Sequence, residues 1–203
     1  MTEPLLLIGS GGHAHALIDV VESCKDWYVL GLVGLPHQVG SQVFGYSVIG
    51  TDHDLPLLRQ QCPNALLAVG QIGFSKKRQE LVAQLEHLKF QLPAVLSGHA
   101  HVSRHSEVGF GTSVGHGVTV NAGAHIGNLC ILNTNALIEH DSVIGDYCHI
   151  STGAVVNGGV KVGFGSFIGS GAVVREGIEL PPQTVISAGK RVMGWPIIDD
   201  LRS

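Results

Sequence analysis

The chain has 203 residues, of which 44% are hydrophobic and 14% charged, so it can bury a real core and does not have the composition of a disordered protein. Its net charge is −4 with the histidines counted as neutral, and it has no basic run, which argues against nucleic acid and anionic membranes as partners. No apolar segment reaches transmembrane length and the four cysteines lack the spacing of a metal site, so we expect reduced thiols in a cytoplasmic protein.

The first 90 residues alternate between strands and helices. The segment "LLLIG", residues 5–9, is an apolar strand that runs into a glycine turn, and the helix after it carries Leu17, Val20 and Val21 on one face. Two further strands are expected at 27–34 and 64–70, and an amphipathic helix at 75–88. This alternation predicts a small parallel sheet, so we assign residues 1–90 to an α/β domain that corresponds to half of a Rossmann fold.

The glycine turn, "GSGGHA" at residues 9–14, matches the dinucleotide pattern G-x-G-x-x-[GA] between a strand and a helix. The acidic residue that usually follows the second strand is missing, because the next carboxylate after Asp26 is Asp52. Because this acidic residue is missing, we do not expect the turn to bind NAD. The turn can still hold a phosphate on the amide groups at a helix N-terminus, or its glycines can serve only the close packing of strand and helix.

From Leu96 onward the sequence has a period of six. Every sixth residue is aliphatic: Leu96, Val102, Val108, Val114, Val120, Ile126, Leu132, Ile138, Ile144, Ile150, Val156, Val162, Ile168, Val174, Leu180, Ile186 and Val192. Four positions after each of these the side chain is nearly always small, and Cys130 and Cys148 occupy that position. A six-residue period fits a solenoid of very short strands in which three hexads close one triangular coil. We therefore predict an all-β solenoid with a C-terminal cap over residues 91–203, with both cysteines in its core.

Two histidines of the solenoid are candidates for chemistry. With eighteen residues per coil, His140 stacks between Ala122 and Gly158, and the adjacent Asp141 also lies between glycines. The small neighbours leave room for a ligand, imidazole is the natural general base near neutral pH, and a carboxylate can orient it. A solvated surface histidine is the alternative. His149 has apolar stacking neighbours, and the histidine spacing does not suggest zinc ligands, so no metal is expected.

The hexads resemble those of the hexapeptide-repeat acyltransferases, which implies a left-handed parallel β-helix. The segments "LLLIGSGGHAHALIDVV", "LLAVG" and "NTNALIEHDSVIGDYCHIS" extend the resemblance to the whole chain. They are similar to the NeuD/PglD-type sugar acetyltransferases, a group of sialic acid O-acetyltransferases and nucleotide-amino-sugar N-acetyltransferases. The resemblance implies acetyl-CoA as co-substrate, a nucleotide sugar as the acceptor, and a homotrimer with active sites between subunits.

The resemblance also implies roles for individual residues. His140 corresponds to the general base, and Asp141 to the acid that raises its basicity. The expected contacts to acetyl-CoA are His149, Asn133, Gly158, Ser170 and Ala188. The expected contacts to the nucleotide sugar are Gly11, Gly12, His13 and Gly70.

Three functions remain open at this point. The leading hypothesis is acetyl-CoA-dependent N-acetylation of a nucleotide-linked 4-amino-deoxy sugar for surface glycan synthesis, by direct attack of the amine. The second is O-acetylation of sialic acid or of another sugar hydroxyl, which the same histidine could assist. The third is a non-catalytic trimeric scaffold or a sugar-nucleotide-binding protein. The sequence does not identify the sugar or its nucleotide.

Overall fold

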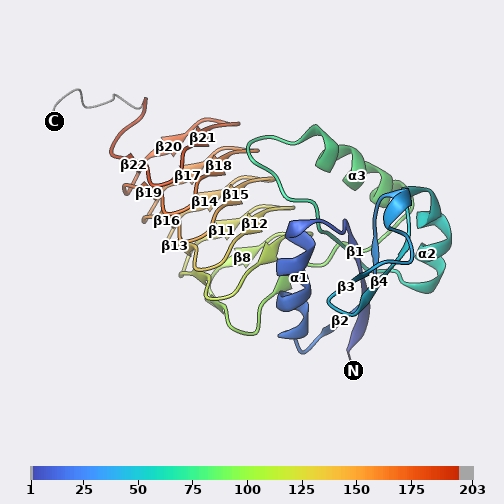
Figure 1. Ribbon diagram of the computed structural model, residues 1–203. Helices are drawn as coiled ribbons and strands as arrows, with labels where there is room; N and C mark the ends of the chain where they lie inside the picture. Colours follow the sequence, from blue (N-terminus) through green and yellow to red (C-terminus); the bar gives the residue numbers. More distant parts are fainter. Residues whose placement is uncertain (1, 197–203) are drawn as a thin grey trace.

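The computed structural model describes residues 2–196 and shows an N-terminal α/β unit beside a long solenoid (Figure 1). The elements of the α/β unit are β1 (Glu3–Ile8), α1 (Gly12–Glu22), β2 (Trp27–Val33), the 3-10 turn η1 (Pro36–Gln38), β3 (Gln42–Val43), β4 (Tyr46–Gly50), the 3-10 turn η2 (Asp52–Asp54), α2 (Leu55–Gln61), β5 (Ala65–Leu67) and α3 (Lys76–His87). The strands and helices predicted at residues 5–9, 27–34, 64–70 and 75–88 are confirmed. The β3–β4 hairpin and α2 were not predicted.

The α/β unit is a sheet of order β3-β4-β2-β1-β5, parallel except for the β3–β4 pair. Successive residues of β1 point to opposite faces of the sheet, as in any strand. Because helices cover both faces, the apolar residues of β1 are buried on either side. Leu5 and Leu7 pack with α1, whereas Leu6 and Ile8 pack with α2 and α3. Figure 1 shows α1 between the sheet and the solenoid and α2 on the far side. The end of β1 and the start of α1 therefore lie near the solenoid.

The solenoid within the described residues consists of two-residue strands that recur every six residues. These are β6 (Val95–Leu96), β7 (His101–Val102), β8 (Glu107–Val108), β9 (Ser113–Val114), β10 (Thr119–Val120), β11 (His125–Ile126), β12 (Ile131–Leu132), β13 (Leu137–Ile138), β14 (Val143–Ile144), β15 (His149–Ile150), β16 (Val155–Val156), β17 (Lys161–Val162), β18 (Phe167–Ile168), β19 (Val173–Val174), β20 (Glu179–Leu180), β21 (Val185–Ile186) and β22 (Arg191–Val192). The aliphatic residue of each predicted hexad is the second residue of each strand, so the predicted register is confirmed.

The strands form three parallel sheets, which we call faces 1, 2 and 3. Face 1 contains β6, β9, β12, β15, β18 and β21, face 2 contains β7, β10, β13, β16, β19 and β22, and face 3 contains β8, β11, β14, β17 and β20. Pairing joins residues eighteen apart, as in Ile131, His149 and Phe167 on face 1. The solenoid is a parallel β-helix with three hexads per coil, as the six-residue period predicted, and its left-handed form is the one that the family resemblance implied.

The corners of the solenoid explain its glycine content. Every sixth residue from Gly111 to Gly189 has a φ between 57° and 75°, a left-handed conformation that glycine adopts without steric cost. Asp141 occupies one of these corner positions with a φ of 59°. Inside, Ile138, Ile150 and both solenoid cysteines are fully buried, as predicted.

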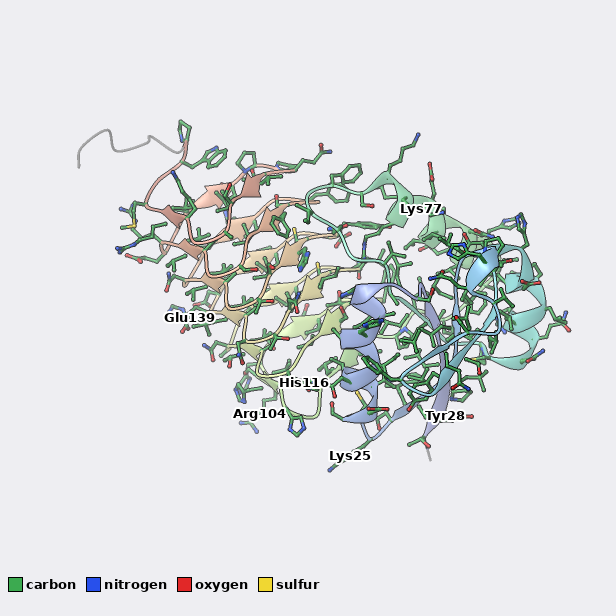
Figure 2. All side chains as sticks on the ribbon, in the orientation of Figure 1. Lys25, Tyr28, Lys77, Arg104, His116 and Glu139 are labelled. Atoms are coloured by element: carbon green, nitrogen blue, oxygen red, sulfur yellow. The ribbon has the colours of Figure 1, made fainter. Side chains whose placement is uncertain are left out.

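Face 1 joins the solenoid to the α/β unit. Arg78, on α3, is 1% exposed, and its guanidinium donates to the carbonyl oxygens of Val69 and Leu129. On α1, Asp19 Oδ2 lies 2.9 Å from His116 Nε2, at the lower coils (Figure 2). The domain boundary at residues 90 and 91 stays a prediction, and residues 197–203 of the predicted C-terminal cap lie outside the described residues. No described helix has the length and apolar character needed to cross a membrane.

Candidate active site

His140 and Asp141 form a pair at the corner between β13 and β14, where face 2 passes into face 3. His140 Nδ1 lies 2.8 Å from Asp141 Oδ2, and both side chains are mostly exposed. Because an ionised carboxylate only accepts hydrogen bonds, the Nδ1 atom carries the proton and Nε2 is the basic nitrogen. The hydrogen bond to Asp141 raises the pKa of His140 above its ordinary value. The pair therefore presents a strengthened base to the solvent.

The neighbours of this pair are the small residues that the eighteen-residue coil predicted. The amide of Asp141 donates to Ala122 O at 3.1 Å, and the amide of Gly159 donates to His140 O at 2.9 Å. A Cβ on Gly158 would lie 2.8 Å from the Cε1 and Nε2 atoms of His140. The ring thus lies directly over Gly158, in an open recess lined by Glu139, His140, Asp141, Asn157, Gly158, Gly159, Glu176 and Gly177.

His149, on β15 of face 1, has a different environment. It is 8% exposed, its Nδ1 lies 2.7 Å from Gln71 O, and its Nε2 lies 3.4 Å from Asn133 Nδ2. Burial lowers the pKa of His149, so the ring is neutral near pH 7. Since Gln71 O only accepts, Nδ1 donates to it and Nε2 is an acceptor. Asn133 fits this assignment, because its Oδ1 already accepts from the amide of Thr134 at 2.8 Å.

The predicted contacts to acetyl-CoA fall on two different edges of the solenoid. Asn133, Ser170 and Ala188 lie at the corner between faces 1 and 2, and the Ser170 hydroxyl is 2.9 Å from that of Ser151. Gly158 lies with His140 at the corner between faces 2 and 3. Figure 2 shows Glu139, the residue before His140, on the side of the solenoid away from the α/β unit. One chain therefore does not bring all of these residues together.

The residues predicted to contact the nucleotide sugar do come together. Gly11, Gly12, His13 and Gly70 line one pocket of about 300 Å³ at the carboxyl end of the sheet. A Cβ on Gly11 or Gly12 would meet open space, and the first amide groups of α1 lack a side-chain cap, so they are free to bind an anion. Gly9 serves the packing role instead, because its φ is +126° and a Cβ there would lie 2.8 Å from Ala68 O.

His13 connects this pocket to the solenoid. It lines both the pocket and a smaller recess between α1 and face 1 that Asn133 and Thr134 also line. Burial, with the nearby charge of Arg78, lowers the pKa of His13 to about 4, so the ring is neutral. Its Nε2 is buried and has no hydrogen-bond partner within residues 2–196. A ligand in the pocket can supply that partner.

Several residues of these sites were not predicted from the sequence. Gln71 and Arg78 reach His149 and the solenoid only through tertiary contacts, so no local pattern indicates them. Asp52 and Lys77 line the pocket, with Asp52 Oδ2 3.7 Å from Lys77 Nζ. Asp52 follows β4 almost directly, and recognising residues 46–50 as a strand would have placed its carboxylate at the edge of the sheet where the other pocket residues lie.

The two solenoid cysteines are not nucleophiles. Both are fully buried, and burial raises the pKa of Cys148 to about 12 and that of Cys130 further. The described part of the chain contains no group of three or more His, Cys, Asp or Glu side chains arranged to hold a metal ion. The site can therefore offer a base, neutral hydrogen-bonding rings and free amide groups.

Comparison with known proteins agrees with this architecture. Residues 4–85 match the family described as the PglD N-terminal domain, and residues 141–176 match the bacterial transferase hexapeptide family. A mutant of perosamine N-acetyltransferase from Caulobacter crescentus, in complex with CoA and GDP-perosamine, is 32% identical with a TM-score of 0.88, over 96% of this chain and 90% of that chain. The acetyltransferase domain of PglB from Neisseria gonorrhoeae, in complex with acetyl coenzyme A, is 28% identical with a TM-score of 0.84, over 95% and 93% of the two chains. No curated protein sequence matches the chain.

The fold and these matches define an acyltransferase of the hexapeptide-repeat class. More narrowly, the chain belongs to the NeuD/PglD-type sugar acetyltransferases.

Proposed function

We propose that the protein transfers the acetyl group of acetyl-CoA to the amino group of a nucleotide-linked amino sugar, and that His140 is the general base. The observation that carries this proposal is the hydrogen bond between His140 Nδ1 and Asp141, which leaves Nε2 as a basic atom over Gly158. The similarity to a perosamine N-acetyltransferase that binds CoA and GDP-perosamine supports the substrate class. The product would serve the synthesis of a surface glycan.

The chemistry needs only groups that the chain supplies. The neutral amine of the sugar attacks the carbonyl carbon of the thioester, and His140 Nε2 takes one amine proton as the C–N bond forms. Asp141 stabilises the resulting imidazolium. When the tetrahedral intermediate collapses, the C–S bond breaks and the proton passes from His140 to the sulfur, so that the products are the amide and free CoA. No acyl-enzyme is needed, in keeping with the burial of Cys130 and Cys148.

The two ligands would occupy different parts of the chain. The amide groups at Gly11 and Gly12 would hold the diphosphate, and His13 and Gly70 would lie along the nucleotide sugar. Because His13 also lines the recess that contains Asn133, the sugar end would point toward the corner between faces 1 and 2. Acetyl-CoA would follow that corner past Asn133, Ser170 and Ala188, and His149 Nε2 would accept a hydrogen bond from it in place of the one from Asn133.

The separation of the site residues supports a homotrimer with active sites between subunits. The outward side chains of face 2 form an apolar column of Leu137, Val155 and Val173, all partly buried, whereas face 3 carries Lys161 and Glu179 as an ion pair. Burying face 2 around a threefold axis would set the corner between faces 2 and 3 of one chain beside the corner between faces 1 and 2 of the next. His140 of one copy would then meet the acetyl donor held by its neighbour.

The test follows release of the CoA thiol from acetyl-CoA with a panel of UDP-, dTDP- and GDP-linked amino sugars and with free sialic acid. We expect turnover with at least one nucleotide-linked amino sugar and none with sialic acid. Turnover with sialic acid alone would refute N-acetylation, and no turnover with any acceptor would favour a binding or scaffold protein.

The role of His140 is tested by His140→Ala, which should lower kcat/KM by about 10² to 10⁴-fold, the usual contribution of a general base. The exposed ring packs against little, so the melting temperature should not change. His125→Ala is the matched control, because His125 is also exposed on the solenoid and lies 3.2 Å from the Glu107 carboxylate. Near-normal activity of His140→Ala would show that another group is the base.

A further inference from the structure

The pocket of the α/β unit contains a polar group at each end. His13 marks the end that faces the solenoid, and Asp52 lies beyond β2 at the other end. Gln38 lies between them, since its side chain accepts from Ser10 at the end of β1. In the sheet order, β4 is separated from β1 by β2, which places Asp52 two strand spacings, about 10 Å, from the end of β1. A nucleotide whose phosphates bind at Gly11 and Gly12 would therefore extend its base toward Asp52.

The structure holds the backbone of Asp52 in place and leaves its carboxylate open to a ligand. Its carbonyl oxygen accepts from Gln84 Nε2 at 3.1 Å, which ties this backbone segment to α3, and Lys77 Nζ lies 3.7 Å from Oδ2. Asp54, two residues on, is not available, because its carboxylate accepts from the amide and hydroxyl of Thr51. Asp52 is the one carboxylate among the described residues that line the pocket.

Gln38 offers a hydrogen-bond donor to a ligand, whereas Asp52 offers acceptors. Its Oε1 accepts from the Ser10 hydroxyl at 2.9 Å and from the amide of Leu35 at 2.8 Å. These two bonds fix the orientation of the amide, so the Nε2 group is left as a donor. From Ser10 outward the pocket thus offers first an amide that donates and then, beyond β2, a carboxylate that accepts, and Leu35 and Val33 supply apolar lining.

We infer that Asp52 reads the base of the nucleotide and selects guanine over uracil and thymine. This inference rests on the proposed function, which it extends to the nucleotide. Guanine presents two adjacent donors, N1–H and the N2 amino group, which a carboxylate binds together, and its O6 and N7 atoms are acceptors that suit Gln38 Nε2. Uracil and thymine instead present one N–H between two carbonyl oxygens. If one carboxylate oxygen accepts from this N–H, the other faces a carbonyl oxygen of the base, and the two negative charges repel. The acceptor would then be a GDP-linked amino sugar.

The test is calorimetric titration of the intact protein with GDP, IDP and UDP, in the wild type and in Asp52→Asn. IDP lacks only the N2 amino group, so the wild type should bind GDP about tenfold or more tightly than IDP or UDP. In Asp52→Asn the affinity for GDP should fall by about tenfold to a hundredfold, that for IDP by less, and that for UDP by less than twofold. Glu80→Gln is the matched control, since Glu80 pairs with Lys76 outside the pocket, and it should keep the wild-type affinities.

Each other outcome rejects a defined part of the argument. Equal losses for GDP and UDP in Asp52→Asn would show that Asp52 binds the ribose, and equal wild-type affinities would show that the pocket does not read the base. Both results overturn the inference and leave N-acetylation of a nucleotide sugar intact. If none of the three diphosphates binds, the pocket is not a nucleotide site and the proposed function loses its acceptor.

Discussion

The hydrogen bond between His140 and Asp141 sets the protonation of the proposed base. Because the carboxylate favours the imidazolium, the pKa of His140 lies above its ordinary value of 6.5. A general base acts in its neutral form, so kcat/KM should rise with pH and level off above this raised pKa. The pKa of His149 shifts the opposite way, because burial lowers it. Of the two histidines, His140 therefore ionises at the higher pH and contributes to the acidic limb, together with the amino group of the acceptor.

Asp141→Asn tests this relation. Removing the negative charge lowers the pKa of His140, so the acidic limb of the kcat/KM profile should move to lower pH. The plateau should fall by roughly tenfold to a hundredfold, because the imidazolium loses its stabilising partner. The measurement is the rate of thiol release between pH 5 and 9. Glu107→Gln, which removes the carboxylate beside His125, should leave the limb in place, and an unchanged limb in Asp141→Asn would show that Asp141 does not tune the base.

At the scale of elements, two consecutive glycines in the corner between β16 and β17 have different roles. Gly159 has a φ of +64°, but a Cβ there would meet open space. Gly158 has no such backbone requirement, yet a Cβ on it would lie 2.8 Å from the imidazole of His140. The first glycine therefore leaves room for the ring, and the second allows the chain to turn.

Alanine substitutions should separate these roles. Gly158→Ala should displace the exposed ring and lower kcat/KM by about tenfold or more with little change in melting temperature. Gly159→Ala should reduce the free energy of unfolding by about 1–2 kcal/mol, the cost of a left-handed non-glycine residue, and keep most of the activity. Thermal unfolding and thiol release measure the two effects. If Gly158→Ala lowered stability and Gly159→Ala lowered activity, the roles assigned to the two glycines would be wrong.

The elements differ in how far the sequence predicts them. In the solenoid one six-residue rule repeats, so seventeen aliphatic positions could be assigned in register and the stacking of His140 on Gly158 followed directly. The β3–β4 hairpin and α2 are too short for a period to emerge, and they were missed. In the sequence Asp52 therefore counts only as the next carboxylate after Asp26, although the hairpin returns the chain to the sheet and places the Asp52 carboxylate in the pocket.

At the scale of the whole molecule, the junction between the two parts lies outside the reach of sequence patterns. The carbonyl oxygen of Gln71 accepts a hydrogen bond from His149, which is 78 residues away in the sequence. Arg78 donates to the carbonyl oxygen of Leu129, which is 51 residues away. Such contacts depend on how α3 and the preceding loop pack on face 1, which no local period encodes. The resemblance to a family supplied the candidate site residues and implied active sites between subunits, and the structure adds that one chain places these residues at two edges of face 2.

Under the proposed function, this division would make activity depend on assembly. Val155 lies on face 2, half-buried between Leu137 and Val173 in the stacked column. Val155→Glu should place a carboxylate in the proposed interface, where burying an unpaired charge is costly, and so produce monomers. These monomers should be inactive, because His140 would be separated from the acetyl donor bound to a neighbouring copy. Sedimentation velocity and thiol release measure the two properties.

Val143→Glu is the matched control, because Val143 is an exposed valine at the same strand position on face 3, where Lys161 is its stacking neighbour. This variant should remain trimeric and active. If Val155→Glu were trimeric and active, face 2 would not be the interface. If it were monomeric and fully active, each chain would hold a complete site, and His140 could not be the base for an acetyl donor bound at the opposite edge.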